Sequence, residues 1–280
     1  MRRERRQRRR GRRLMGRTTL IAGCGRLGLR VAALLQEAGG EVLGLRRDPR
    51  DLPAGITSVV ADLSAPLTSP LPPADALVIT LPPSGFADLR APLQHLRDAV
   101  PALPVRTVLI SSTRVLEGYD ASRPLTEADP PRPRSERARR LVEGEEAARE
   151  LFDAIVLRAA GIYGPGRDRL IRAVREQRPV EHDRRTNRIH EQDLARAVVA
   201  LLEVPEPPRL LHAVDAAPAP LGEVVGHIAA HLDLPVPPRA LPDPGSGTVL
   251  DGTALHRLLG YLEVPDHRAG YAAILAGESA

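Results

Sequence analysis

The sequence predicts an α/β fold, a doubly wound parallel sheet followed by a small, mostly helical C-terminal lobe. Short apolar segments alternate with amphipathic segments of helical period through the first 160 residues. Strands that helices cover on both faces read as continuous apolar runs, which is typical of parallel sheets. After Gly166 the alternation stops, and helical segments separated by proline-rich joints take over.

The elements follow from these periods in chain order. The expected strands are 18–22, 41–45, 58–61, 76–81, 105–111 and 154–158. The expected helices between them are 26–38, about 86–100, and 136–151, with a polar, proline-rich loop at 117–133. In the C-terminal lobe, helices are expected at 170–177, 193–203, 221–232 and 253–260.

A glycine-rich turn joins the first expected strand to the first expected helix. Its six residues form a G-x-G-x-x-G pattern: Gly23, Cys24, Gly25, Arg26, Leu27 and Gly28. Glycine permits the tight turn, the close approach of a pyrophosphate and the close packing of helix on strand. The pattern therefore predicts a Rossmann-type dinucleotide site, and the alternative is a purely structural turn. The domains we expect are an NAD(P)-binding domain at 15–166 and a substrate lobe at 167–280.

The positive net charge of +5 is concentrated at the N-terminus. Residues 1–13 hold nine Arg and one Glu, and the rest of the chain has 31 basic and 34 acidic residues. We expect residues 1–14 to be a disordered Arg-rich tail upstream of a true start at Met15. The alternative is a nucleic-acid-binding arm, although nucleic acid is not the partner that we expect.

Cysteine, lysine and apolar runs limit the remaining classes of protein. Cys24 is the only cysteine, which excludes an internal disulfide and favours a cytoplasmic location. No apolar run reaches membrane-spanning length, and no Cys/His spacing indicates a metal site. The chain has no lysine, so mechanisms that need a lysine amine are excluded.

Several passages together resemble the extended short-chain dehydrogenase/reductase family, which includes nucleotide-sugar epimerases and dehydratases. Besides the glycine turn, these are Asp62-Leu63, Ser111–Val115, Leu157–Gly166 ("LRAAGIYGPG") and Asn187–Ala195 ("NRIHEQDLA"). The resemblance implies that Asp62, Leu63, Leu81 and Ser111 contact the cofactor and that Ser112 is the catalytic serine. Cys24 is expected to face the cofactor loop.

The residues after the second expected strand bear on the choice of cofactor. An acid here would bind the adenosine ribose of NAD, whereas Arg accepts the 2′-phosphate of NADP. The chain has Arg46 and Arg47, followed by Asp48. We therefore expect NADP to be preferred over NAD. Alternatively, both arginines are solvated loop residues.

The catalytic helix departs from the family pattern. The family uses a Tyr-x-x-x-Lys pair, but here Arg137 takes the Tyr place and Leu141 the Lys place when the helix is aligned on Glu145. An Arg cannot exchange protons near pH 7 because its pKa stays above about 12. Arg137, with its neighbours Arg139 and Arg140, either binds an anionic group or belongs to a solvated helix face.

Four further residues are candidate substrate contacts by resemblance, namely Tyr163, Arg167, Arg188 and His190. Tyr163 and Arg167 fit structural packing equally well, and His190 fits a strand-end residue better than a proton shuttle. Arg188 would hold a nucleotide-sugar phosphate. We expect Asp193 to be the N-cap of its helix.

The function that these observations favour is an NAD(P)-binding oxidoreductase or epimerase with a non-standard active site. Its substrate would be a small polar or nucleotide-linked molecule, and relatives make a homodimer a further expectation. The alternative is a non-catalytic NADP(H)-binding redox sensor or partner-binding protein.

Overall fold

A computed structural model describes residues 16–48, 50, 52–82, 85–241 and 247–278. The Arg-rich tail expected at 1–14 lies outside the described residues. The chain divides into two compact units. The first unit comprises the chain up to Ser112, Ser135–Arg158 and Ala195–Leu211, and the second comprises Thr113–Arg134, Ala159–Leu194 and the chain from His212. We expected one boundary at residue 166. In the structure each unit consists of three separate segments of the chain.

The first unit is built on a seven-stranded sheet with the order β11-β7-β5-β4-β1-β2-β3. All pairs from β3 to β5 are parallel, and the order reverses beside β1, as in a doubly wound fold. The strands are β1 (Thr18–Ala22), β2 (Glu41–Arg46), β3 (Ile56–Val60), β4 (Ala76–Ile79), β5 (Arg106–Ser112), β7 (Ile155–Ala159) and β11 (Leu210–Ala213). The predicted fold class is thereby confirmed.

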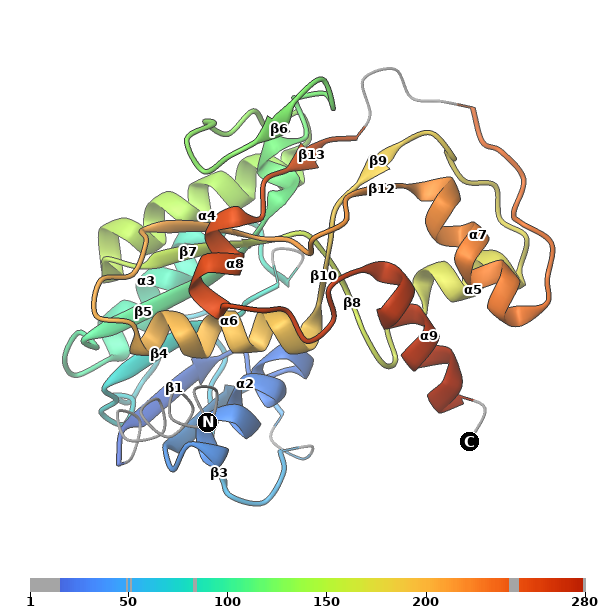
Figure 1. Ribbon diagram of the computed structural model, residues 1–280. Helices are drawn as coiled ribbons and strands as arrows, with labels where there is room; N and C mark the ends of the chain where they lie inside the picture. The colour runs from blue at the N-terminus through green and yellow to red at the C-terminus, as the bar shows by residue number, and fades with distance from the viewer. Residues whose placement is uncertain (1–15, 49, 51, 83–84, 242–246, 279–280) are drawn as a thin grey trace. The chain divides into compact units, whose positions relative to one another are not determined.

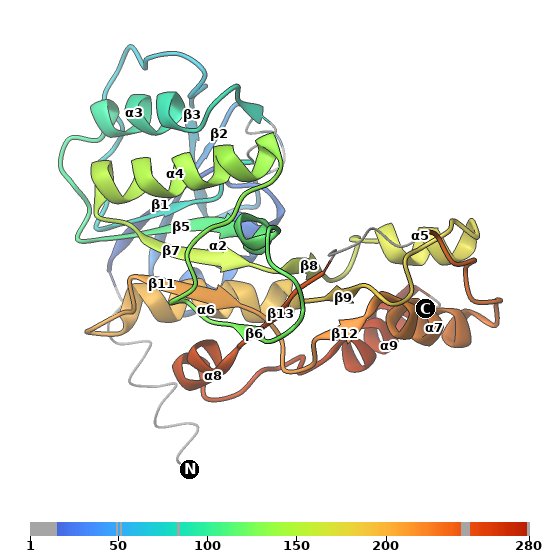
Figure 2. The ribbon, with the colours of Figure 1, turned by 90° about the horizontal axis from the view of Figure 1, so that it is seen from above.

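Helices cover both faces of this sheet. They are α2 (Arg26–Glu37), α3 (Arg90–Ala99), α4 (Glu136–Phe152) and α6 (Glu191–Glu203). Figures 1 and 2 show α3 and α4 on one face, with α2 and α6 on the other. None of the helices within the described ranges is long and apolar enough to cross a membrane.

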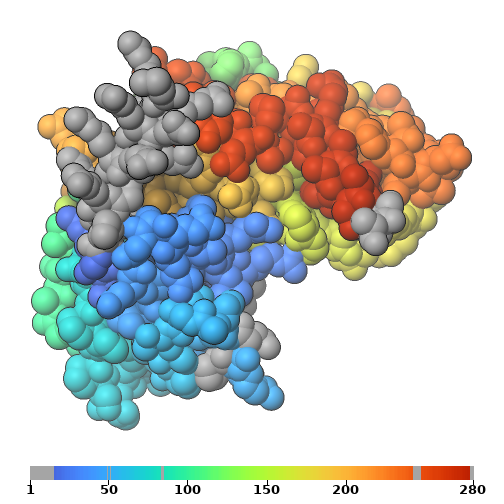
Figure 3. All heavy atoms as spheres, turned by 60° about the horizontal axis from the view of Figure 1, so that its bottom comes forward, coloured from blue at the N-terminus to red at the C-terminus, as the bar shows by residue number. Residues whose placement is uncertain are grey.

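Aliphatic side chains fill the core of the first unit because the chain has few aromatic residues. Leu20, Leu77, Ile79 and Leu96 are completely buried there. In the space-filling view the blue atoms, which belong to the N-terminal part of the first unit, lie together on one face (Figure 3). This packing fixes the carboxyl ends of the strands, where open α/β sheets bind their ligands.

The second unit contains short strand pairs and helices. The strand pairs are β6 (Pro124–Leu125) with β13 (Val249–Leu250), β8 (Gly161–Tyr163) with β10 (Arg188–His190), and β9 (Arg185–Thr186) with β12 (Ala219–Pro220). The 3-10 turn Thr113–Leu116 opens the unit, and its helices are α5 (Arg169–Arg175), α7 (Leu221–Leu232), α8 (Thr253–Leu259) and α9 (His267–Glu278). Its core joins α5, α7 and α9 around Tyr163 and Tyr271.

Asp193 does not have the role that the sequence suggested. α6 begins at Glu191, directly after β10, so Asp193 lies in the first turn and is not the N-cap. Its buried carboxylate instead accepts hydrogen bonds from the backbone N–H groups of Glu263 and Val264, both at 2.9 Å. The side chain therefore ties the segment before α9 to the start of α6.

Candidate functional site

The glycine turn after β1 is held in place by the backbone of its neighbours. The N–H groups of Gly23 and Cys24 both donate to the carbonyl of Leu45 at the end of β2. The hydroxyl of Thr80, just after β4, donates to the carbonyl of Gly23 at 2.5 Å. Gly23 has a φ of +88°, in the left-handed region that favours glycine. Three parallel strands thus fix the turn.

The residues at the start of α2 favour binding of an anion. Gly25 is the N-cap and provides no side-chain cap, and the first turn has no acidic residue. Gly28 lets the helix approach β1, because a Cβ there would lie 3.1 Å from a methyl group of Ile21. Free N–H groups and the positive end of the helix dipole attract anions. The turn has the geometry that a pyrophosphate requires.

Cys24 does not face the cofactor loop with its thiol, contrary to our expectation. Its side chain is completely buried, and its Sγ packs beside Gly28 and Gly44. Burial raises the pKa of the thiol to about 11, and the charge of Arg46 offsets this only in part. The inward direction follows from the alternation of side chains as the chain leaves β1. The residue as a whole is 0% exposed, and its backbone N–H is already bonded to the carbonyl of Leu45.

Three charged residues at the end of β2, namely Arg46, Arg47 and Asp48, differ in burial and in their partners. Arg46 is half-buried and close enough to influence the Cys24 thiol, whereas Arg47 is exposed. Asp48 is bound by Arg50, with a 2.5 Å contact between Oδ2 and Nη2. This hydrogen bonding lowers the pKa of Asp48. The carboxylate is therefore already engaged by a side chain, and Arg46 lies nearer the turn.

The other predicted cofactor contacts lie after neighbouring strands of the same sheet. Asp62 follows β3, is exposed, and accepts a hydrogen bond from the N–H of Ser64. Leu63 is buried in the core, while Leu81 is half-buried after β4. The strand ends therefore place Asp62 and Leu81 at the carboxyl edge of the sheet, on either side of the glycine turn.

Ser111 and Ser112 close β5 but point to opposite faces of the sheet, because side chains alternate along a strand. Ser111 is buried, and its hydroxyl donates to Oε1 of Glu145 on α4 at 2.6 Å. Glu145 pairs with Arg158 of β7, and the closest contact is 2.8 Å. Sequence reasoning did not find this buried pair, because nothing in the spacing matches one charge to the other. Ser112 is half-buried at the strand end.

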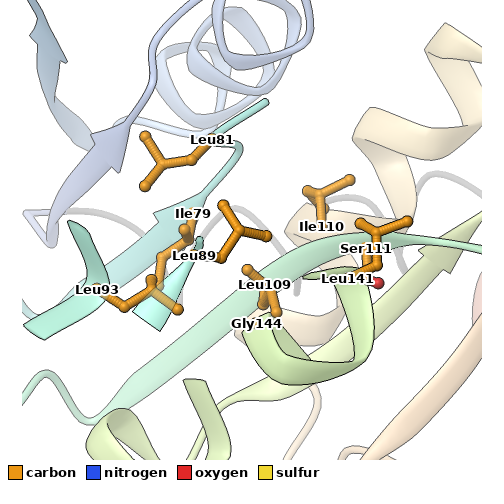
Figure 4. A pocket seen from close by; sticks show the side chains of 9 residues that line it. All are labelled: Ile79, Leu81, Leu89, Leu93, Leu109, Ile110, Ser111, Leu141 and Gly144. Atoms are coloured by element: carbon orange, nitrogen blue, oxygen red, sulfur yellow. The ribbon is translucent and has the colours of Figure 1, made fainter. Parts of the chain in front are cut away.

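A small apolar pocket lies where β4 and β5 meet α3 and α4 (Figure 4). Its lining residues are Ile79, Leu81, Leu89, Leu93, Leu109, Ile110, Ser111, Leu141 and Gly144. Leu141, which we expect at the place of the family lysine, is one wall of this pocket. α4 packs closely against Leu89 at Gly144, where a Cβ would lie only 2.7 Å from Cδ1 of Leu89. Apart from Ser111, the side chains that line the pocket are apolar.

Arg137 is exposed in the first turn of α4. Its neighbours Arg139 and Arg140 each lie 3.4 Å from the carboxylate of Glu136. These two contacts favour the solvated-face interpretation for Arg139 and Arg140. Among the described residues Arg137 has no ion-pair partner, so the anion-binding interpretation stands for this residue as a prediction.

Within the second unit, Tyr163 and His190 pack together. The ring of His190 meets Tyr163 edge-on at a centroid distance of 5.2 Å, and Tyr271 stacks on Tyr163. The Tyr163 hydroxyl donates to the carbonyl of Asp266 at 2.9 Å, and burial raises its pKa. Nδ1 of His190 lies 3.3 Å from the N–H of Gln192. These contacts support the packing interpretation of Tyr163 and the strand-end interpretation of His190.

The two arginines of the second unit that were candidate substrate contacts differ. Arg167 donates to the buried carboxylate of Glu191 at 2.8 Å, so it has a structural partner. Arg188 is almost completely buried, and its guanidinium donates to the Thr186 hydroxyl. Burial lowers the pKa of Arg188, and the charge of Asp215 opposes this shift.

Asp215 and His267 are buried polar residues that the sequence did not single out. Oδ2 of Asp215 and both ring nitrogens of His267 have no hydrogen-bond partner among the described residues. Burial raises the pKa of Asp215 to about 7 and lowers that of His267 to about 4. Both groups feel the charge of Arg188, so the three residues form an electrostatically coupled cluster.

Comparisons with known proteins agree with this geometry. The family model of the NAD-binding domain of D-isomer-specific 2-hydroxyacid dehydrogenases matches residues 1–85. Among solved structures, a protein assigned to the NAD-dependent epimerases/dehydratases, from Methylobacillus flagellatus, is 31% identical, with a TM-score of 0.80. The match covers 94% of this chain and 99% of that chain. A comparison with curated proteins finds no match.

Two more distant structures share the fold. MoeE5, in complex with UDP-glucuronic acid and NAD, is 24% identical, with a TM-score of 0.76 and coverage of 94% of this chain and 99% of that chain. The UDP-glucuronic acid 4-epimerase from Bacillus cereus, in complex with UDP-glucuronic acid and NAD, is 17% identical, with a TM-score of 0.72. That match covers 92% of this chain and 98% of the epimerase.

Proposed function

The chain belongs to the NAD-dependent epimerase/dehydratase family of extended short-chain dehydrogenases/reductases, and we propose that it binds a nicotinamide dinucleotide at the glycine turn. The observation that carries this proposal is the uncapped N-terminus of α2 behind a turn held by Leu45 and Thr80. The residues that would hold the cofactor are the turn itself, Arg46, Asp62, Leu81 and the end of β5. The bound group would supply hydride transfer.

For the cofactor we propose NADP in preference to NAD. Arg46 ends β2 close enough to the glycine turn to influence the Cys24 thiol. The carboxylate of Asp48, which would otherwise accept the ribose hydroxyls, is bound to Arg50. A planar guanidinium suits a 2′-phosphate, so the balance at this strand end favours the phosphorylated ribose.

The reaction that we propose is an oxidoreductase- or epimerase-type step on a small polar or nucleotide-linked substrate. The relatives MoeE5 and the Bacillus cereus epimerase are complexed with a UDP-sugar acid and NAD. In this chain Ser112 would donate a hydrogen bond to a substrate oxygen, while Arg137 would bind an anionic group. Because α4 has neither Tyr nor Lys, substrate or water would exchange the proton.

A second function is supported by that same departure. By our alignment of α4 on Glu145, the exposed Arg137 and the buried Leu141 stand where the family has its proton-transfer pair. A protein with an intact dinucleotide site and no such pair fits a non-catalytic redox sensor or partner-binding subunit. Binding without turnover distinguishes this function from the first.

Calorimetric titration of the purified protein with NADPH and NADH tests the cofactor proposal. We expect tight NADPH binding, and we expect Arg46→Ala to weaken it about 10-fold or more, as loss of a charge-assisted phosphate contact does. Arg97→Ala on α3 is the matched control and should bind as wild type does. Absence of binding of both dinucleotides, in reduced and oxidised forms, contradicts the proposal.

Turnover assays with nucleotide sugars and small carbonyl compounds test the catalytic proposal. If a substrate is found, Ser112→Ala should lower kcat with little change in the affinity for NADPH. Unchanged turnover in Ser112→Ala would exclude the role of this serine. NADPH binding with no turnover across the substrates favours the sensor function.

A further inference from the structure

Three secondary-structure elements of the first unit each contribute one polar side chain to an otherwise apolar layer. Ser111 comes from β5, Glu145 from α4 and Arg158 from β7. Glu145 and Arg158 are each 1% exposed, and Ser111 is 6% exposed. The surrounding residues on the same elements, such as Ala148 and Val156, are apolar. We call these three polar residues the buried triad.

The carboxylate of Glu145 is the centre of the buried triad. Nε of Arg158 donates to Oε1 at 2.9 Å and Nη2 donates to Oε2 at 2.8 Å, which is a two-point contact. Ser111 adds a third hydrogen bond to Oε1, and Arg149 lies 3.5 Å from Oε2. A guanidinium and a carboxylate that meet at two points are fixed in both distance and angle.

Stability alone does not account for such a pair. Removing two charges from water costs about as much as their attraction returns, so an apolar replacement is often equally stable. What the pair adds is direction, because hydrogen bonds fix the rotation of α4 above the sheet. Leu141 and Arg137 lie one and two turns before Glu145 on the same face of the helix. The buried triad therefore also sets the position of those residues.

The buried triad fixes the part of the sheet around β5 and β7, on the side of the glycine turn opposite to β2 and β3. In a doubly wound sheet the pyrophosphate lies at the turn after β1, and the two nucleotide halves extend over strands on either side. Arg46 and Asp62 follow β2 and β3, so the adenosine half belongs on that side. The order then places the nicotinamide half over β4 and β5, where Ser111 and Ser112 lie.

We propose that Glu145 is a positioning residue which, through its contacts with Arg158 and Ser111, fixes the end of β5 and the facing side of α4 for the nicotinamide half of the cofactor. This rests on the proposed dinucleotide function. Glu145 itself touches neither cofactor nor substrate. It acts through Ser111, which precedes Ser112 and lines the apolar pocket.

The test compares a whole dinucleotide with a fragment that lacks nicotinamide. Affinities are measured for NADPH and for 2′-phospho-ADP-ribose, together with NADH and ADP-ribose. Ser111→Ala removes one hydrogen bond and leaves the ion pair in place. The double variant Glu145→Gln/Arg158→Met removes the pair without leaving an uncompensated buried charge. Ser111→Thr keeps the hydroxyl.

Ser111→Ala should weaken binding of the dinucleotide about 3- to 10-fold, which matches the loss of one hydrogen bond, while the fragment changes less than about 2-fold. The double variant should show the same selective loss. Ser111→Thr should bind the dinucleotide about as tightly as the wild type does. Leu96→Ala, a core substitution on α3, should lower Tm and leave the ratio of the two affinities unchanged.

Equal losses for dinucleotide and fragment, or no loss in either variant, would overturn the inference. So would a wild-type protein that binds the fragment as tightly as the dinucleotide, although the proposed cofactor site would then stand. A wild-type protein that binds neither fragment nor dinucleotide overturns the proposed function itself. The two failures are therefore distinguishable.

Discussion

The hydroxyl of Thr80 donates a hydrogen bond of 2.5 Å to the carbonyl of Gly23, which joins the end of β4 to the glycine turn after β1. A Cβ on Gly23 would lie 3.1 Å from this hydroxyl oxygen and 3.2 Å from the Thr80 carbonyl carbon. The contact therefore leaves no room for a side chain at the position where the backbone also has a positive φ.

Gly23→Ala should lower the free energy of unfolding by about 1–3 kcal/mol, because both the φ and the contact with Thr80 oppose a side chain. It should also abolish dinucleotide binding. The matched control is Gly226→Ala, since Gly226 lies within α7 and a Cβ there meets nothing within 4 Å. The control should gain about 0.5–1 kcal/mol from helix propensity. Urea denaturation measures both, and equal effects would contradict the interpretation.

Cys24 should react slowly with iodoacetamide in the native protein. The thiol is fully buried and its pKa is raised to about 11, so access and thiolate fraction are both low at pH 8. Added NADPH should change the rate little, because the side chain points away from the ligand edge. Mass spectrometry follows the reaction, with urea-unfolded protein as the fast control. Rapid native alkylation that NADPH blocks would show that the thiol faces the cofactor.

Asp215→Asn should make stability less dependent on pH. Burial raises the pKa of Asp215 to about 7 in the folded state, whereas the ordinary pKa of 3.8 applies when the chain is unfolded. The folded state thus binds more protons between these values, so this group makes stability fall as pH rises from about 4 to about 7. The neutral Asn should therefore raise Tm relative to wild type more at pH 8 than at pH 5.

Exposed Asp183 provides the control for this measurement. Its side chain is 85% exposed beside Arg239, so Asp183→Asn should shift Tm equally at both pH values. His267 changes the pH dependence of stability in the opposite direction, because its lowered pKa makes stability fall as pH drops from 6.5 towards 4. Only the difference between wild type and variant isolates Asp215. A difference that does not grow with pH would contradict the prediction.

Asp193→Ala should lower the free energy of unfolding by about 2–4 kcal/mol, because it removes a buried carboxylate that accepts two backbone N–H hydrogen bonds. Those groups belong to Glu263 and Val264, in the segment before α9. Asp183→Ala removes an exposed carboxylate and should cost less than about 0.5 kcal/mol. Denaturation curves compare the two, and similar values would show that the Asp193 contacts contribute little.

The sequence predicted much of the fold, because six of the seven strands of the main sheet are apolar runs next to a clear break. The bounds of β1 and α7 agree with the expected ones, and those of α2 and α4 differ by one residue at the C-terminal end. β11 was missed because its residues form a very short run after prolines. α9 was missed although Asp266, whose side chain accepts from the N–H of Ala269, is a recognisable capping residue.

The glycine turn was predictable because its chemistry is local. The direction of the Cys24 side chain and the start of α6 were not, since both depend on how neighbouring strands end. The pairing of Glu145 with Arg158 could not be predicted from the sequence for another reason. Thirteen positions separate these residues, and each lies in a segment whose pattern predicts only a helix or a strand.

The late position of β11 has a consequence for biosynthesis. β11 pairs beside β7, yet a long excursion through the second unit separates the two in the chain. While the ribosome is still translating that excursion, the nascent sheet ends at β7, whose backbone N–H and C=O groups lack a neighbour on that side. An open sheet edge attracts other extended chains. The nascent polypeptide therefore passes through a stage in which β7 is an unpaired edge strand, and this edge is covered only when β11 has been translated.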